Sequence, residues 1–174
     1  MPLLQGTDGA GDAAWVTTLT DTLTATAVLC PAAEVAVVAA DPTPTSGTSG
    51  TVYRMSTTGG AYSITLPTAV VGQTFTFVFT AITVTNDLTF NCAAVTNAMV
   101  GCVTISPDDG AENTWAICAD GITHDRMLIN MNGAGNVLVG SYVRFTALTS
   151  TLWYVEGSIA ASAAAAGAVV FSSN

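Results

Sequence analysis

An alternation of large apolar residues with small hydroxyl residues predicts two β-strands near the middle of the chain. Apolar side chains occupy every second position in residues 62–66, and the alternation resumes in residues 74–79 after a proline and a glycine. A period of two places Phe75, Phe77 and Phe79 on one face of a strand. We expect the two strands to pair as the core hairpin of an antiparallel β domain.

The phase of this alternation changes after Phe79. The next large apolar positions are Ile82 and Val84, which fall on even numbers instead of odd ones. One inserted residue turns every later side chain to the other face of a sheet. The shift therefore predicts a β-bulge or bend near Thr80 and Ala81.

Further short strands are expected along the chain, each followed by a turn signal. The candidates are residues 51–55, 88–92, 100–105, 114–119, 127–131, 137–147 and 152–159. The turn signals are Asn86-Asp87, residues 106–110, Asp120-Gly121 and Asn132-Gly133. Closely spaced strands without a long amphipathic helix are typical of an all-β fold. The sequence predicts an antiparallel β-sandwich or barrel, jelly-roll-like in form.

The clearest boundary is the stretch 41–50, which is rich in proline, glycine and threonine. It contains no large apolar residue and is typical of a linker. We therefore divide the chain into an extended N-terminal arm (1–40), the linker, a β-sandwich body (51–159) and an alanine-rich C-terminal tail (160–174).

The arm itself favours extended backbone. Residues 15–26 are dense in threonine, a β-branched residue that suits strands better than helices. Residues 34–40 are a candidate strand, for which a short helix over residues 32–40 is an alternative. At roughly 3.3 Å per residue, such an arm reaches on the order of 130 Å when extended. That length is enough to lace across neighbouring subunits.

The composition indicates a component of an assembly. Half of the 174 residues are hydrophobic, no lysine is present, and 9% are charged, against about 25% in ordinary soluble domains. The mean hydropathy is +0.54. A surface so poor in charge is expected to be buried against other copies of the chain or against another protein.

The charge balance argues against nucleic acid as a partner. Three arginines face twelve acidic residues, which gives a net charge of −9 and leaves little to neutralise phosphates. No membrane span is predicted, because residues 28–40 contain Pro31 and Glu34, and residues 159–171 are mostly small. The first 15 residues lack the pattern of a secretory signal, so we expect synthesis in a cytoplasm.

Two groups of polar residues are candidates for chemistry. The only histidine lies in His124-Asp125-Arg126, which can be read as a general-base site or as a polar turn. Catalysis needs a third group, and no nucleophile-elbow motif is present, so the turn is favoured. The carboxylates of Asp108, Asp109, Glu112 and Asp120 can ligate Ca²⁺ only if the fold gathers them. They match no EF-hand pattern, so turn formation is again the favoured interpretation.

The remaining glycine-rich segment, residues 6–11, neither follows a predicted strand nor opens a helix. A phosphate-binding loop is therefore not expected there. Taken together, the sequence predicts no catalytic residue, no cofactor and no metal ligand.

The four cysteines, Cys30, Cys92, Cys102 and Cys118, lack the paired spacing of a zinc site. Three disulfide pairings are possible for the full set. The last three lie in strand-like stretches with apolar neighbours, where free cysteine behaves as a small hydrophobic residue. Together with cytoplasmic synthesis, this favours free thiols.

Two tryptophans, Trp115 and Trp153, lie in alternating strands. We interpret them as anchors of the core or of a subunit interface. A sugar-binding platform, as in a lectin, is the alternative.

Four segments of the body together carry a resemblance to a known class of protein. They are residues 61–67 (AYSITLP), 71–79 (VGQTFTFVF), 140–147 (GSYVRFTA) and 153–159 (WYVEGSI). Their order resembles that of β-rich head proteins of tailed bacteriophages, above all the capsid decoration, or cement, proteins. The arm and the tail are not covered, and related patterns occur in phage tail and fibre proteins.

The resemblance implies a non-enzymatic virion protein that binds the outside of an assembled capsid and stabilises it. The implied partner is the major capsid protein, and the implied oligomer is a homotrimer at three-fold positions. No catalytic residue is carried over. The alternative function is a tail, fibre or adhesion module that recognises a host surface. An enzyme is the third hypothesis and the least favoured, since no catalytic constellation is visible.

Overall fold

The structure, a computed structural model, describes residues 34–37, 44–45, 49–82, 86–107, 114–130, 137–161 and 168–173. All of them belong to one compact unit, residues 32–174. They form eleven strands and one 3₁₀ turn, with no α-helix among them. Accordingly, the described part of the chain contains no helix of the length and apolarity needed to span a membrane.

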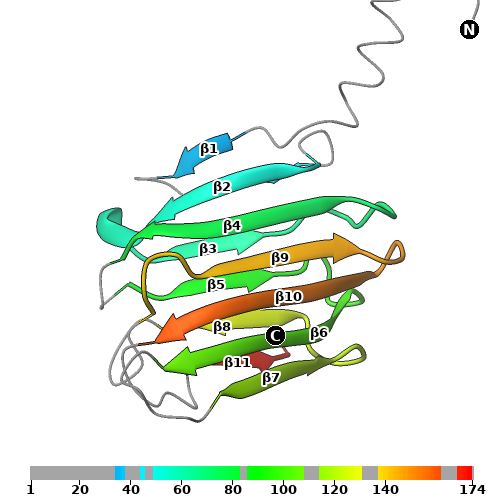
Figure 1. Ribbon diagram of the computed structural model, residues 1–174. Coiled ribbons are helices and arrows are strands. Elements are labelled where there is room, and N and C mark those ends of the chain that lie inside the picture. Colours follow the sequence, from blue (N-terminus) through cyan, green and yellow to red (C-terminus); the bar gives the residue numbers. More distant parts are fainter. Residues whose placement is uncertain are drawn as a thin grey trace, which may run out of the picture. The chain divides into compact units, whose positions relative to one another are not determined.

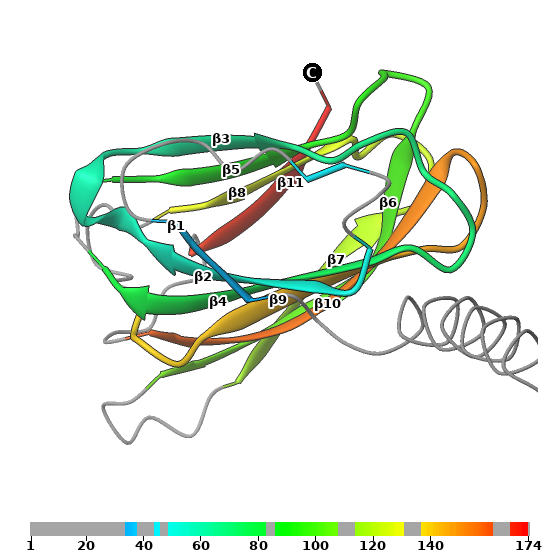
Figure 2. The same cartoon turned by 90° about the horizontal axis from the view of Figure 1, so that it is seen from above.

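The strands form two sheets that pack face to face (Figures 1 and 2). The larger sheet has the order β1-β2-β4-β9-β10-β6-β7 and the smaller has the order β11-β8-β5-β3. The larger sheet consists of β1 (Glu34–Val37), β2 (Thr51–Ser56), β4 (Thr74–Ala81), β6 (Ala98–Pro107), β7 (Trp115–Asp120), β9 (Tyr142–Ala147) and β10 (Leu152–Ala161). The smaller consists of β3 (Tyr62–Thr65), β5 (Leu88–Asn91), β8 (Arg126–Ile129) and β11 (Val169–Ser172). The predicted all-β sandwich is confirmed.

The pairing within the sheets differs from the expected hairpins. β3 and β4 do not form a hairpin with each other, because they lie in opposite sheets. β3 pairs in parallel with β5, while β4 pairs in parallel with β2 and antiparallel with β9. The chain repeatedly crosses from one sheet to the other, so strands adjacent in sequence often face each other across the core. The sheets are therefore mixed, with β6–β7 and β9–β10 as antiparallel neighbours along the chain.

The predicted bulge in β4 is confirmed. Met55 pairs with Phe79, but the next residue of β2, Ser56, pairs with Ala81. Thr80 is the extra residue, and its hydroxyl donates a hydrogen bond to the Met55 carbonyl at 3.0 Å. The bulge restores pairing after the change of phase that is visible in the sequence.

The core lies between the two sheets and is rich in aromatic rings. Phe75, Phe77 and Phe79 are all fully buried, as their alternation predicted. Rings from both sheets meet at the centre: the centroid of Phe77 lies 4.8 Å from that of Phe90 and 6.0 Å from that of Phe145. Such edge-to-face pairs stabilise a core beyond the burial of their area.

The sandwich extends beyond the predicted body at both ends. In the predicted arm, β1 forms the edge of the larger sheet by pairing with β2. Of the two alternatives for residues 34–37, the strand is therefore correct and the helix is not. In the predicted tail, β10 continues to Ala161 and β11 completes the smaller sheet against β8. Burial of Val169 and Phe171 explains why this end is held. Residues 15–26 of the arm and the Asn132-Gly133 turn lie outside the described residues.

Candidate functional site

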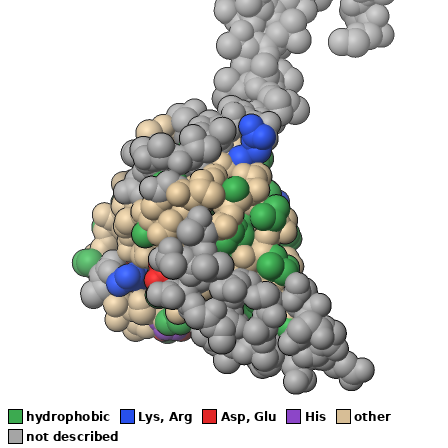
Figure 3. Space-filling view, turned by 90° about the vertical axis from the view of Figure 1, so that its left-hand side faces the viewer, with side chains coloured by type: hydrophobic (Ala, Val, Ile, Leu, Met, Phe, Trp, Pro, Cys, Tyr) green, Lys and Arg blue, Asp and Glu red, His purple; other side chains and the backbone are tan. Residues whose placement is uncertain are grey.

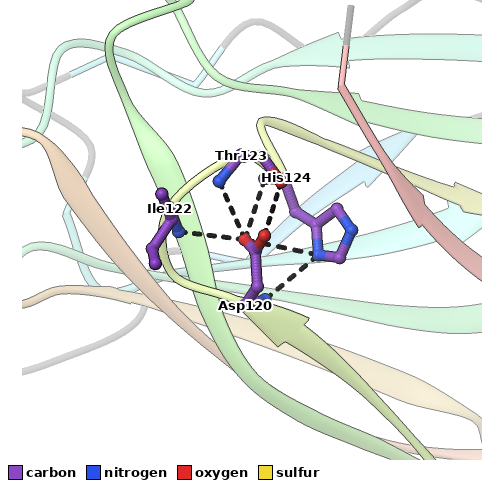
Figure 4. Close-up of polar contacts among 4 residues, drawn as sticks. All are labelled: Asp120, Ile122, Thr123 and His124. Atoms are coloured by element: carbon purple, nitrogen blue, oxygen red, sulfur yellow. Dashed lines mark hydrogen bonds and ion pairs between the residues drawn. The ribbon is translucent and has the colours of Figure 1, made fainter.

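The segment around His124 is a polar turn between β7 and β8 (Figure 4). One oxygen of the Asp120 carboxylate accepts the backbone N–H groups of Ile122, Thr123 and His124 at 2.9–3.0 Å. The other oxygen accepts the Thr123 hydroxyl. Gly121 provides the positive φ of 74° that lets the chain reverse so tightly. The carboxylate therefore organises its own loop.

These hydrogen bonds also favour the ionised form of Asp120. The Thr123 hydroxyl and then the backbone donors hold the pKa of Asp120 far below its usual range. Nδ1 of His124 accepts the Asp120 backbone N–H at 3.0 Å. Both side chains are thus engaged with the local backbone of the turn.

Cys92 is a buried free thiol, as the sequence predicted. Its backbone N–H donates to the Asp125 carbonyl at 2.8 Å, which ties the end of β5 to the turn. Burial, and then the charge of Asp125, raises the pKa of the Cys92 thiol to about 12. A thiol that stays protonated at neutral pH is a poor nucleophile.

The expectation of free thiols is wrong for Cys102 and Cys118. They form a disulfide between β6 and β7, with Cα atoms 4.1 Å apart, and they are directly paired in the strand register. Both are exposed on the outside of the larger sheet. A signal was present in the sequence, because the two cysteines are equally distant from Gly110 at the end of the predicted turn. Residues equidistant from a hairpin turn face each other across the strands.

Of the four carboxylates considered as calcium ligands and favoured as turn residues, only Asp120 lies in the described residues. Asp120 is engaged in its own turn, while Asp108, Asp109 and Glu112 lie outside the described residues, as do Cys30 and the glycine-rich segment 6–11. Within the described ranges, no group of three or more His, Cys, Asp or Glu side chains is placed to hold a metal ion.

Trp153 is a core residue. It is fully buried, and its ring lies 5.8 Å from that of Phe75. Trp115 is part of β7, but its side chain lies outside the described set. A sugar platform built on Trp153 is therefore excluded by burial.

The outward face of the larger sheet carries mostly small and hydroxyl side chains. Its half-exposed tyrosines, Tyr142 and Tyr154, lie on β9 and β10. Between them in the register is the pair Arg144 and Glu156, whose charged groups are 3.6 Å apart. The tyrosines therefore do not form one aromatic cluster.

Charge is scarce over the whole described sandwich. The charged residues with described side chains are Arg54, Asp87, Asp120, Asp125, Arg126, Arg144 and Glu156. Three arginines and four acidic residues give these described residues a net charge of about −1. Most of the chain's net charge of −9 therefore belongs to other residues. The sandwich presents threonine, serine and aliphatic groups instead of a charged surface.

Comparisons of the chain with protein families, with curated proteins and with solved structures gave no match.

Proposed function

We propose that this chain is a structural protein of a tailed bacteriophage, which binds the outside of the assembled capsid and stabilises it. The proposal rests first on the resemblance of four body segments to capsid decoration proteins. Its partner is the major capsid protein, and its working form is a homotrimer. It acts by binding alone and performs no chemistry.

The observation that carries the proposal is the scarcity of charge on the described sandwich. Exposed side chains of ordinary soluble domains are rich in Lys, Glu and Asp. These charges keep the surface hydrated and oppose association between copies of the protein. Here the Arg144–Glu156 ion pair is set among Thr, Ser and aliphatic groups. Such a surface suits burial against a protein lattice through many shallow contacts.

Two further features support the proposal: edge strands that can pair with neighbouring chains, and a disulfide that suits a particle outside the cell. The sheets end in edge strands, β1 and β7 in one and β3 and β11 in the other, which offer backbone groups for pairing with neighbouring chains. The exposed Cys102–Cys118 disulfide suits a protein that works outside the reducing cytoplasm. Synthesis in the host cytoplasm followed by oxidation after release is consistent with both.

The test is removal and restoration of the protein on purified particles. Binding to the assembled shell, and not to free subunits, must raise the resistance of the shell to heat by mass action. At a concentration a hundredfold above Kd the gain is about 2.7 kcal/mol per site. Occupancy and the temperature of rupture are followed together while the protein is added back at ~50 to ~500 mM salt, where exposed charge pairs are progressively screened.

We expect rupture temperature to rise with occupancy, and occupancy to change little with salt, because few charges are available. Rupture that is indifferent to occupancy would reject stabilisation and favour the adhesion module. A steep loss of occupancy with salt would retain the function but overturn the charge-poor mode of binding.

A further inference from the structure

Four loops meet at one end of the sandwich, the right-hand end in Figure 1. They are residues 66–73, 92–97, 121–125 and 148–151, which connect β3 to β4, β5 to β6, β7 to β8 and β9 to β10. Backbone hydrogen bonds tie them together. Cys92 donates to Asp125, Ala98 donates to Thr151, and Gly72 donates to Ala147, at 2.8–2.9 Å.

This end gathers most of the exposed aliphatic side chains of the described residues. All four loops contribute, and we call the set the aliphatic end: Val70, Val71, Val95, Ile122 and Leu148. Ile122 and Val95 are the most exposed, at 83% and 78%. The other exposed large hydrophobic residues, Val139, Tyr142, Tyr154 and Val170, are distributed over other parts of the sandwich. Exposed apolar groups concentrated in one region mark an interaction surface.

The same end is almost free of charge. Three of its four loops contain no charged residue, and the fourth contains Asp125 and follows Asp120. Asp125 is buried. The carboxylate of Asp120 is surrounded by donors from its own turn. The half-buried Arg126 begins β8 beside this loop.

The opposite end has a different character. There, Pro107 and Thr114 flank the sequence stretch that carries Asp108, Asp109 and Glu112. Figure 3 looks at this end, where basic, acidic and hydrophobic side chains are all visible among polar and backbone atoms. The two ends therefore differ in charge: the loops of the aliphatic end are almost free of it, and the opposite end flanks an acidic stretch of the sequence.

We propose that the aliphatic end is the surface by which the sandwich docks on the assembled protein shell, at an apolar and weakly charged site. This inference rests on the proposed function and adds the orientation of the molecule. Docking by this end buries aliphatic groups without desolvating unpaired charge, which is the costly step at an interface. It also directs the strand ends that flank the acidic stretch away from the shell.

A second copy of the chain is the less fitting occupant. The exposed aliphatic residues elsewhere, Val139 and Val170, lie apart on the loop before β9 and on β11. Among the described residues, a second copy can therefore offer a matching apolar surface only through the same end, and an end-to-end dimer hides that surface from any lattice. A lipid bilayer fits poorly as well, because anionic headgroups attract basic clusters and the described residues of the four loops include no Lys or Arg.

The experiment uses charge introduced into the exposed aliphatic side chains of the full chain. Val71→Asp and Ile122→Asp alter the aliphatic end, and Val139→Asp is the matched control at the opposite end. Val71 and Val139 are similarly exposed, at 69% and 62%, so neither change disturbs the core. Thermal melting checks folding, and each protein is measured for occupancy on stripped shells, for self-association by sedimentation, and for binding to phosphatidylcholine vesicles.

We expect Val71→Asp and Ile122→Asp each to weaken shell binding by about tenfold or more, which one buried, unpaired carboxylate is sufficient to cause. Val139→Asp is expected to bind as the unaltered protein does. If the unaltered protein binds shells and all three variants bind equally well, the aliphatic end is not the docking surface, while the proposed function stands. If the first two variants lose only self-association or only vesicle binding, a second copy or a lipid surface is the occupant and the proposal is overturned. Failure of the unaltered protein to bind any shell rejects the proposed function and this inference with it.

Discussion

Replacing Phe77 by alanine tests whether the aromatic centre holds the two sheets together. Phe77 is fully buried in β4, and its ring contacts rings from both sheets. It stacks on Tyr53 of β2 with centroids 4.9 Å apart, and it meets Phe90 of β5 and Phe145 of β9 edge-on. Among the described ring pairs, Phe77 alone has three partners. It thereby joins β2, β4 and β9 of the larger sheet to β5 of the smaller one.

The expected loss follows from the cavity and the ring contacts. Removing a buried phenyl ring costs about 3–5 kcal/mol, and each aromatic pair adds about 0.5–1.5 kcal/mol beyond its buried area. A domain of this kind has roughly 5–15 kcal/mol of total stability. The variant should therefore lose a large share of it, with a fall in Tm of roughly 6–20 °C. Phe77→Leu keeps most of the volume and should cost about 1–2 kcal/mol.

Urea denaturation followed by tryptophan fluorescence measures these losses, since Trp153 is buried in the same core. Tyr142→Ala is the control, because Tyr142 is 40% exposed on the outward face of the same sheet. It should cost less than about 1 kcal/mol. A loss below about 1 kcal/mol for Phe77→Ala, or an equal loss for the control, would refute the packing described here.

Three further outcomes are expected. Replacing Cys102 and Cys118 together by serine should lower the free energy of unfolding by about 3 kcal/mol, the value for a loop of about 15 residues, and reduction of the unaltered protein should reproduce the loss in a denaturation curve. Cys92 should react with a thiol reagent at pH 8 only after unfolding. Because its pKa is raised from 9.0 to about 12, its contribution to stability is full below pH 9.0 and is lost as pH rises toward 12. Cys92→Ala should remove that part of the pH profile of stability. Because the pKa of Asp120 is lowered, its stabilisation is full above pH 3.8 and is lost progressively on stronger acidification. Asp120→Asn should therefore lower Tm at pH 7, and the difference in Tm should shrink as pH falls below 3.8.

Much of the local structure could be predicted from the sequence, because it depends on short-range patterns. Alternation with a period of two places Phe75, Phe77 and Phe79 on the inner face wherever β4 is located. The change of phase at Thr80 requires a bulge in any sheet that buries both halves of the strand. The scarcity of charge and the preference of Asp120-Gly121 for a turn likewise follow directly from the amino-acid sequence.

The tertiary structure alone decided which strands are neighbours. The alternation in β3 and β4 is satisfied equally by a hairpin or by two strands facing each other across a core, since both bury the same faces. The same holds for β11, whose short apolar run becomes a strand only because β8 provides its partner. The gathering of Val71, Val95, Ile122 and Leu148 at one end is also invisible in the sequence. Each lies in a separate loop, and it is the repeated crossing between sheets that brings those loops to the same end.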